Sequence, residues 1–348
     1  MAKLEISAVD LFCGAGGLTY GLAKSGIRVI AGVDIDKHCE YPYEQNNEAE
    51  FVIKDVTDLS GKELSSWFIP GTVRLLAGCA PCQPFSSHSK GRDTSQDPKW
   101  PLLDEFSRLV SEVKPELVTM ENVSRIQSHL VFRRFVTRLE GLGYHVAWES
   151  LYCPRFGIPQ ERRRLVLMAS LLGPITIPKP THSADEYPSV RSAIGQLPKI
   201  RAGEYLKNDP LHLAREMSDI NLERLKHSKP GGTWLDWPKN LRSPCHNKST
   251  GRTFQSVYSR MEWDQPSPTI TTQFFNFGTG RFGHPAQNRA LTLREGAILQ
   301  SFPAKYRFTE PRQLPKMLHI GRLIGNAVPP RLAEVVGRTF VAHVKDHQ

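Results

Sequence analysis

The first half of the chain alternates between continuous apolar runs and stripes of apolar residues at helical spacing. The continuous runs, which predict buried strands, lie at residues 6–12, 28–33, 51–54, 73–78, 117–120 and 165–168. The stripes, which predict amphipathic helices, lie at residues 18–26, 102–110 and 130–142. Strands that alternate with helices are typical of a sheet covered by helices on both faces. The pattern therefore predicts an α/β protein with a doubly wound sheet.

The first predicted strand runs into a glycine-rich turn at residues 13–17, and the second predicted strand ends in Asp34. This order is the opening of a doubly wound sheet that binds a nucleoside. The turn lacks the complete Gly-x-Gly-x-x-Gly pattern, which disfavours a dinucleotide. Asp34 could accept hydrogen bonds from ribose hydroxyls, and Asp55, after the third strand, could accept one from an exocyclic amine such as that of adenine. The alternative is that both acids only cap loops or helices.

Cys82 follows the fourth predicted strand, in a loop that Pro81 and Pro84 stiffen. A thiol at the carboxyl end of a strand is where an open α/β sheet would place a reactive group. We interpret Cys82 as a nucleophile; a metal ligand, a redox partner and a packed core residue are the alternatives. Cys79 completes a C-x-x-C spacing, but no second pair or Cys/His group is evident. We therefore expect no metal and assign Cys79 a structural role.

A carboxylate and a run of arginines add further candidate chemistry. Glu121 follows the strand at 117–120 and would open onto the same sheet edge as Cys82, although it could instead be an acid at a helix start. Strand alternation would put Arg162 and Arg164 on one face, where they could hold a base carbonyl and phosphates. The alternative for these arginines is a solvated face.

Composition bears on the class of binding partner and on the cellular compartment of the protein. The chain has 348 residues, with 45 Lys+Arg against 35 Asp+Glu, and this basic excess is compatible with a polyanionic partner as well as with ordinary scatter. No apolar run approaches ~20 residues, so we expect no membrane span. Glu5 stands where a secretory signal would have its apolar core, and the six cysteines are scattered. We therefore expect a cytoplasmic protein with reduced thiols.

Six segments then occur in an order that resembles the DNA (cytosine-5)-methyltransferases, namely residues 10–17, 81–86, 121–123, 160–164, 291–295 and 325–329. The resemblance covers nearly the whole chain. It implies a Rossmann-like, class I methyltransferase sheet with a second, smaller target-recognition domain. It also implies methyl transfer from S-adenosylmethionine to carbon 5 of a cytosine that is flipped out of duplex DNA. The reaction would pass through a covalent adduct between Cys82 and carbon 6 of the base.

The resemblance also implies roles for individual residues. Glu121 would protonate nitrogen 3 of the base, while Arg162 and Arg164 would hold the base and nearby phosphates. The residues implied to bind S-adenosylmethionine are Phe12, Gly14, Gly16, Gly17, Asp34, Ile35, Asp55, Val56, Pro81 and Asn326. Two positions depart from the family pattern. Ile35 replaces a common bulky aromatic, so we expect weaker stacking on adenine, and Ala80 replaces the first proline of a common Pro-Pro-Cys, so we expect a slightly softer loop.

The resemblance divides the chain into a catalytic domain at 1–179, a target-recognition domain at 180–290, a connecting segment at 291–319 and a return to the catalytic domain at 320–348. Arg294 and Glu295 would form an ion pair that braces the recognition domain. Residues 86–92 resemble the mobile loop that closes over the flipped base, or are an ordinary exposed loop. We expect a monomer that binds double-stranded DNA, with a companion restriction endonuclease that it need not contact.

Other functions remain open at this point. A tRNA cytosine-5 methyltransferase is the nearest alternative, because one branch of the same family acts on RNA. A catalytically inactive DNA-binding or regulatory protein belongs to a different class, and the presence of Cys82, Glu121, Arg162 and Arg164 argues against it. An NAD-dependent enzyme is disfavoured by the incomplete glycine pattern.

Overall fold

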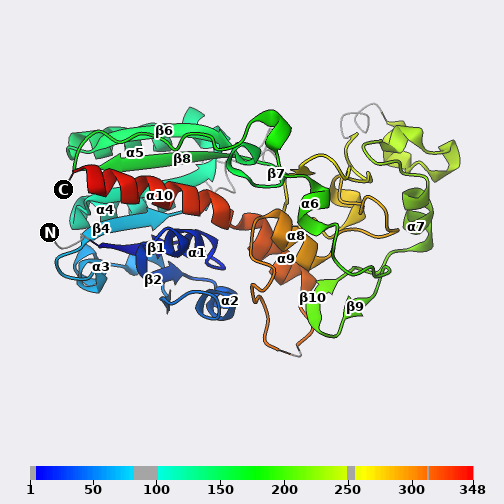
Figure 1. Ribbon diagram of the computed structural model, residues 1–348, viewed down its shortest axis with the longest axis horizontal. Helices are drawn as coiled ribbons and strands as arrows, with labels where there is room; N and C mark the ends of the chain where they lie inside the picture. Colours follow the sequence, from blue (N-terminus) through cyan, green and yellow to red (C-terminus); the bar gives the residue numbers. More distant parts are fainter. Residues whose placement is uncertain (1–4, 82–100, 249–254, 312, 348) are drawn as a thin grey trace. The chain divides into compact units, whose positions relative to one another are not determined.

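The computed structural model describes residues 5–81, 101–248, 255–311 and 313–347. The chain forms two compact units (Figure 1). Unit 1 comprises Met1–Phe156, Arg163–Thr181 and Ala327–Gln348, and unit 2 comprises Gly157–Arg162 and His182–Asn326. No helix among the described residues is long and apolar enough to cross a membrane. The division puts residues 291–326 in unit 2, including the start of the segment that we expected to return to the catalytic domain.

Unit 1 is built around a seven-stranded sheet of order β3-β2-β1-β4-β5-β8-β6. The strands are β1 (Ile6–Leu11), β2 (Arg28–Asp34), β3 (Glu50–Ile53), β4 (Val73–Gly78), β5 (Leu117–Val123), β6 (His145–Tyr152) and β8 (Arg163–Ser170). Pairing is parallel from β3 to β5, whereas β8 runs antiparallel to both β5 and β6. The predicted doubly wound α/β sheet is confirmed, with β5 three residues longer than its apolar run.

Helices cover both faces of this sheet. The helices of unit 1 are α1 (Gly17–Lys24), α2 (Glu40–Glu44), α3 (Gly61–Trp67), α4 (Pro101–Val113), α5 (Leu130–Gly141) and α10 (Pro330–Asp346). One face packs against α3, α4 and α5 in a large apolar cluster centred on residues such as Phe106 and Phe135. Helices α1 and α10 lie side by side on the other face (Figure 1).

A glycine permits the close packing of α1 on α10. A Cβ atom placed on Gly21 would lie 2.2 Å from the carbonyl oxygen of Pro330, at the start of α10. The contact joins the first and the last segments of the chain within unit 1, and any larger side chain at position 21 would push them apart.

Unit 2 has short elements joined by long irregular segments. Its helices are α6 (Val190–Ile194), α7 (Asp219–Lys226), α8 (Leu293–Leu299) and α9 (Met317–Asn326). Its strands are β7 (Gln160–Glu161), β9 (Tyr205–Leu206), β10 (Asp209–Leu213) and β11 (Ser267–Pro268). Trp234 and Trp237 lie in one of its apolar clusters, together with Leu225, Leu241 and Phe277.

The expected ion pair between Arg294 and Glu295 is wrong. Arg294 pairs with Asp209, with Nε 2.8 Å from Oδ2, and Glu295 accepts two hydrogen bonds of 2.7 Å from the buried Arg289. The two residues are neighbours on α8, and successive residues of a helix point about 100° apart, so their side chains reach different partners. Both nevertheless brace unit 2, because each pair joins α8 to another part of that unit.

Candidate active site

The strand register brings the predicted site residues of unit 1 to one edge of the sheet. Leu11 pairs with Gly78, and Gly78 pairs with Met120, so β1, β4 and β5 present their carboxyl ends together. The chain order reverses between β1 and β4, and such a switch point is where open α/β sheets bind ligands. Phe12, Cys79 and Glu121 each stand one position beyond these aligned residues.

The turn after β1 adopts backbone angles that favour glycine. Gly14 and Gly16 have φ angles of 52° and 84°, and Phe12, the residue that opens the turn, has a φ of 59°. Phe12 is a non-glycine residue in the left-handed region, which is uncommon and is concentrated at functional sites. A Cβ atom on Gly14 would meet nothing within 4 Å, so the space beside this turn is open. Gly17 is the first residue of α1.

Asp34 ties the glycine turn to the end of β2. Its Oδ2 accepts a hydrogen bond of 2.9 Å from the Gly14 backbone N–H, and its Oδ1 accepts one of 2.9 Å from that of Asp36. Burial raises the pKa of Asp34, and these backbone donors lower it in part. The capping role that we kept as an alternative is therefore present. Each oxygen still has a second lone pair with which it could accept from a ribose hydroxyl.

Asp55 and Ile35 lie at neighbouring strand ends, because Asp34 pairs with Ile53 across β2 and β3. Asp55 caps a short 3-10 turn: its Oδ1 accepts from the backbone N–H and the hydroxyl of Thr57, at 2.9 and 2.8 Å. The side chain of Ile35 is exposed, at 66%, whereas that of Val56 is buried. An exposed aliphatic side chain beside Asp34 provides an apolar surface for a planar base.

Glu121 is the buried acid at this edge, with only 6% of its surface exposed. The Cys79 thiol donates a hydrogen bond of 3.1 Å to its Oε2. Arg164 Nε lies 2.9 Å from its Oε1, but the pair lacks hydrogen-bond geometry, and Oε1 accepts no hydrogen bond from any described residue. One carboxylate oxygen is thus held by a neutral donor, while the other is close to a positive charge and has acceptor capacity left.

The loop that leads to Cys82 is fastened to β5. Asn122 Nδ2 donates a hydrogen bond of 3.0 Å to the carbonyl oxygen of Ala80, and Asn122 is buried. Cys82 and the predicted mobile loop at 86–92 lie outside the described residues, whereas Pro81 is the last residue before that gap. The segment up to Pro81 is therefore fixed against the strand that carries Glu121.

Arg162 and Arg164 do not share a strand face as we expected, because β8 begins only at Arg163. Arg162 belongs to unit 2 and is 1% exposed. Its guanidinium donates to the carbonyl oxygens of Ile270 and Gly325, at 3.0 and 3.1 Å. Arg164 belongs to unit 1 and lies beside Glu121. Asn326, the last residue of α9, also belongs to unit 2.

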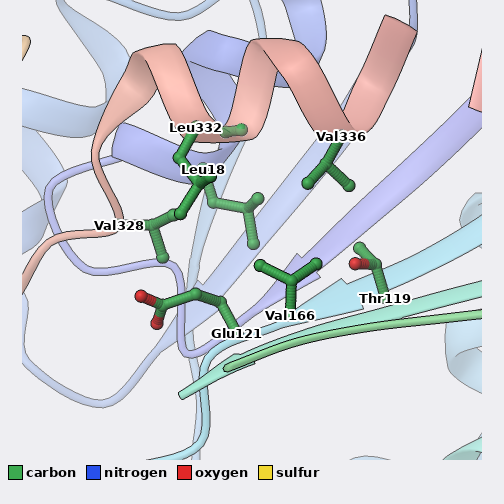
Figure 2. Close-up of a pocket in the computed structure, with 8 residues that line it drawn as sticks. Leu18, Thr119, Glu121, Val166, Val328, Leu332 and Val336 are labelled. Atoms are coloured by element: carbon green, nitrogen blue, oxygen red, sulfur yellow. The ribbon is translucent and has the colours of Figure 1, made fainter. Parts of the chain in front are cut away.

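A small cavity lies between the sheet and α10, within unit 1 (Figure 2). Its volume of ≈ 10 Å³ is enough for about one water molecule. It is lined by Leu18, Thr119, Glu121, Val166, Val328, Leu332, Ala333 and Val336. Figure 2 shows Glu121 and Thr119 on either side of Val166; Val166 and Thr119 point toward the helix, whereas the Glu121 side chain extends along the edge of the sheet toward Val328. Glu121 is therefore one of two polar residues that line a mostly apolar cavity, and its side chain is 6% exposed to solvent.

Asp10, the first residue of the segment 10–17, is a fully buried acid to which the sequence assigned no role. The hydroxyl of Thr19 donates a 2.8 Å hydrogen bond to its Oδ2 and lies 3.0 Å from the Tyr43 hydroxyl. Burial raises the pKa of Asp10 to about 7. The network ties β1 to the first turn of α1 below the glycine turn. Cys79 is the other residue whose contact the sequence missed, because a C-x-x-C spacing points to a partner thiol and says nothing of a carboxylate at the end of the neighbouring strand.

No group of three or more potential metal ligands occurs in the described parts of the chain.

The family model for C-5 cytosine-specific DNA methylases matches residues 6–342. The chain is 47% identical over 337 residues to the Type II methylase M.HgiDII of Herpetosiphon aurantiacus, covering 96% of this chain and 94% of that protein. It is 34% identical to the Type II methyltransferase M1.HphI of Haemophilus parahaemolyticus, covering 97% and 87% of the two chains.

Solved structures share the fold. A DNA modification methyltransferase encoded within an E. coli prophage matches with a TM-score of 0.71 at 21% identity, over 98% of this chain and all of that one. The DNMT2 of Spodoptera frugiperda matches with a TM-score of 0.67 at 16% identity, over 97% of this chain and all of that one. At these identities the likeness extends to the fold alone.

Proposed function

The chain belongs to the C-5 cytosine-specific DNA methylases, and from this premise we propose how it acts. We infer that it transfers a methyl group from S-adenosylmethionine to carbon 5 of a cytosine extruded from a specific duplex DNA sequence. The observation that carries the proposal is Glu121, a buried carboxylate with one oxygen that accepts no hydrogen bond from the described residues, at the sheet edge to which Pro81 and the cofactor-type turn also belong.

The residues of unit 1 fit the methyl donor. The glycine turn leaves open space beside Gly14, Asp34 retains acceptor capacity at the end of β2, and Ile35 presents an exposed apolar side chain next to it. We propose that these groups hold the nucleoside, with Phe12, Gly16 and Gly17 shaping the turn. Asp55, Val56, Pro81 and Asn326 are further contacts that the family resemblance implies. When bound, S-adenosylmethionine supplies an electrophilic methyl group.

Cys82 is our proposed nucleophile, on the strength of its place directly after Pro81. Carbon 5 of cytosine is a weak nucleophile, and addition of the Cys82 thiolate to carbon 6 converts the ring to an enamine that can attack an electrophile at carbon 5. The thiolate is the reactive form, so the site must favour it over the thiol. Loss of the carbon 5 proton and expulsion of Cys82 then restore the aromatic ring. The tie between Asn122 and Ala80 supports this role, since it fixes the approach of the loop.

Glu121 is our proposed acid for nitrogen 3 of the base. Addition at carbon 6 pushes electron density onto the ring, and a proton delivered to nitrogen 3 neutralises it. Oε1, which accepts no hydrogen bond from the described residues, is the atom that would hold this proton. The burial of Glu121 beside a small, mostly apolar cavity limits its contact with bulk water (Figure 2). Arg164 lies beside the same oxygen and would contact the base or stabilise the carboxylate once its proton has left.

Arg162 receives a different role from the one its motif implies. Its guanidinium is buried and donates to two backbone carbonyl oxygens in unit 2. We propose that it braces unit 2 and that Arg164 is the arginine available to the chemistry. Unit 2 would then be the part that reads the DNA target, and the net charge of +10 would favour phosphates.

The relatives named above are Type II enzymes of bacteria, so we propose a restriction–modification or solitary bacterial methyltransferase. It would act on chromosomal DNA in the cytoplasm, as a monomer, with any companion endonuclease binding the same sequence independently. Transfer of labelled methyl groups to duplex DNA and to tRNA tests this choice. We expect incorporation into duplex DNA; incorporation into tRNA alone would favour the RNA-modifying alternative, and incorporation into neither would favour an inactive DNA-binding protein.

A further inference from the structure

Cys79 is a second thiol at the candidate active site, and the function proposed above leaves it without a role. It directly follows β4, and its backbone N–H donates to the Leu11 carbonyl oxygen at 3.2 Å, which continues the pairing of β4 with β1. Its backbone is therefore held rigidly at the sheet edge. From this position its thiol reaches across to β5 and donates a hydrogen bond of 3.1 Å to Glu121 Oε2.

We infer that Cys79 is a positioning residue for the methyl-transfer reaction, whose thiol fixes the orientation of the Glu121 carboxylate toward the base. The inference rests on the proposed function, because it takes Glu121 as the acid for nitrogen 3. A glutamate side chain is long and flexible, so a carboxylate at the end of β5 needs a directed contact to hold one orientation. Among the described residues, Cys79 supplies the side-chain hydrogen bond to this carboxylate, whereas Arg164 is close but poorly aligned.

The choice of a thiol has a chemical consequence. A hydrogen bond from a charged donor would strongly favour the ionised carboxylate and oppose its protonation. A neutral thiol is a weak donor. It can hold Oε2 in place while Oε1 keeps the capacity to carry a proton to the base. The thiol thus orients Glu121 with a smaller bias toward the ionised carboxylate than a charged donor would impose, which suits an acid that must gain and lose a proton in each turnover.

Loss of the Cys79 thiol should therefore slow the chemical step without weakening binding. In Cys79→Ala, we expect single-turnover methyl transfer to duplex DNA to fall about three- to tenfold, the range for one neutral hydrogen bond. KM for DNA and for S-adenosylmethionine should stay unchanged, because Cys79 would contact neither. The pH–rate profile should move to higher pH, since the ionised carboxylate loses a donor.

Two substitutions separate orientation from packing. Cys79→Ser keeps a donor in the same place, so we expect a rate within about threefold of wild type and a pH–rate profile moved to lower pH, because a hydroxyl is the stronger donor. Cys153→Ala removes a buried thiol elsewhere in unit 1 and should change neither rate nor profile. Equal losses in Cys79→Ala and Cys79→Ser, with no change of profile, would show that the thiol only fills space and would overturn the inference.

A double-mutant cycle with Glu121→Gln completes the test. If Cys79 acts through Glu121, then Cys79→Ala should reduce the rate of methyl transfer little further in the Glu121→Gln background. If instead the two rate losses multiply in the double variant, Cys79 does not act through Glu121. Should Glu121→Gln alone transfer methyl groups as fast as wild type, the role of Glu121 in the proposed function fails, whatever the Cys79 variants show. If Cys79→Ala fails to fold, the test rests on the pH–rate profile of Cys79→Ser. A profile identical to that of wild type would then count against the inference.

Discussion

The buried ion pair between Arg289 and Glu295 in unit 2 allows a stability test, because its contribution to the free energy of unfolding can be estimated from the structure. Glu295 is 1% exposed and Arg289 is fully buried. The two form a bidentate pair with both distances at 2.7 Å, and the Thr292 backbone N–H donates to Glu295 Oε2 at 2.8 Å. Desolvation raises the pKa of Glu295, but Arg289 and the other donors outweigh it and lower the pKa from 4.5 to about 2. At 1.36 kcal/mol for each pH unit, this difference corresponds to about 3 kcal/mol of folding free energy.

Glu295→Gln should therefore destabilise unit 2 by about 3–5 kcal/mol at neutral pH, because it leaves the Arg289 charge buried without its partner. The assay is chemical denaturation followed by tryptophan fluorescence, to which unit 2 contributes three of the chain's six tryptophans, Trp234, Trp237 and Trp263. Glu223→Gln is the matched control. Its partner Lys226 and Glu223 itself are both exposed, so loss of that pair should cost less than about 1 kcal/mol.

The pH dependence gives a second test of the same pair. The folded pKa of Glu295 is lowered, so its contribution is complete above pH 4.5 and is lost as the pH falls toward about 2. His284, 3.7 Å from Glu295, has its pKa lowered by burial from 6.5 to about 4, so it is neutral at pH 7 and adds no ion pair there. The destabilisation by Glu295→Gln should shrink below pH 4.5. A loss under about 1 kcal/mol at neutral pH, or one independent of pH, would refute this reasoning.

Two further predictions concern other buried charges. Asp10 has a folded pKa raised from 3.8 to about 7, so its contribution to stability is complete below pH 3.8 and is lost as the pH rises through 7. The stability of Asp10→Asn relative to wild type, measured by thermal unfolding, should therefore rise by up to about 4 kcal/mol between pH 4 and pH 8; a flat difference would contradict the assignment. Arg162→Ala should lower the melting temperature and leave the rate of methyl transfer by the folded protein nearly unchanged, whereas Arg164→Ala should slow methyl transfer at least about tenfold. Equal effects of the two substitutions on both readouts would show that the proposed division of roles is wrong.

The sequence predicted the sheet of unit 1 well, because most of its strands can be recognised from the residues of their own segments. Apolar runs marked six of the seven strands, and the glycine turn with Asp34 marked the carboxyl ends of the first two. Strand β6 was missed, because most of its side chains are exposed or only partly buried and it has no apolar run. Where a prediction depended on contacts between distant segments, it failed. Arg294 and Glu295 are neighbours in sequence, yet Arg294 pairs with Asp209 on β10, 85 residues away, while Glu295 pairs with Arg289 in the segment just before α8. No periodicity in the chain encodes such a choice of partner.

The arginine run and Cys79 illustrate the same limit within the site. Strand alternation was applied to Arg162 and Arg164, but the strand begins between them, and a boundary shift of one or two residues is enough to change which groups meet. Cys79 is placed on Glu121 by the register of β4 on β5. That register follows from the assembled sheet, so the thiol was predicted only as a structural residue.

Trapping on duplex DNA that contains 5-fluorocytosine at the target position tests the central claim most directly. Fluorine cannot leave carbon 5 as a proton does, so the enzyme should stop after methyl transfer with Cys82 still bonded to carbon 6. In the presence of S-adenosylmethionine, we predict a denaturation-resistant protein–DNA complex for the wild-type chain and none for Cys82→Ser. A complex that forms equally with Cys82→Ser, or wild-type methylation of DNA without any trapped complex, would contradict the account.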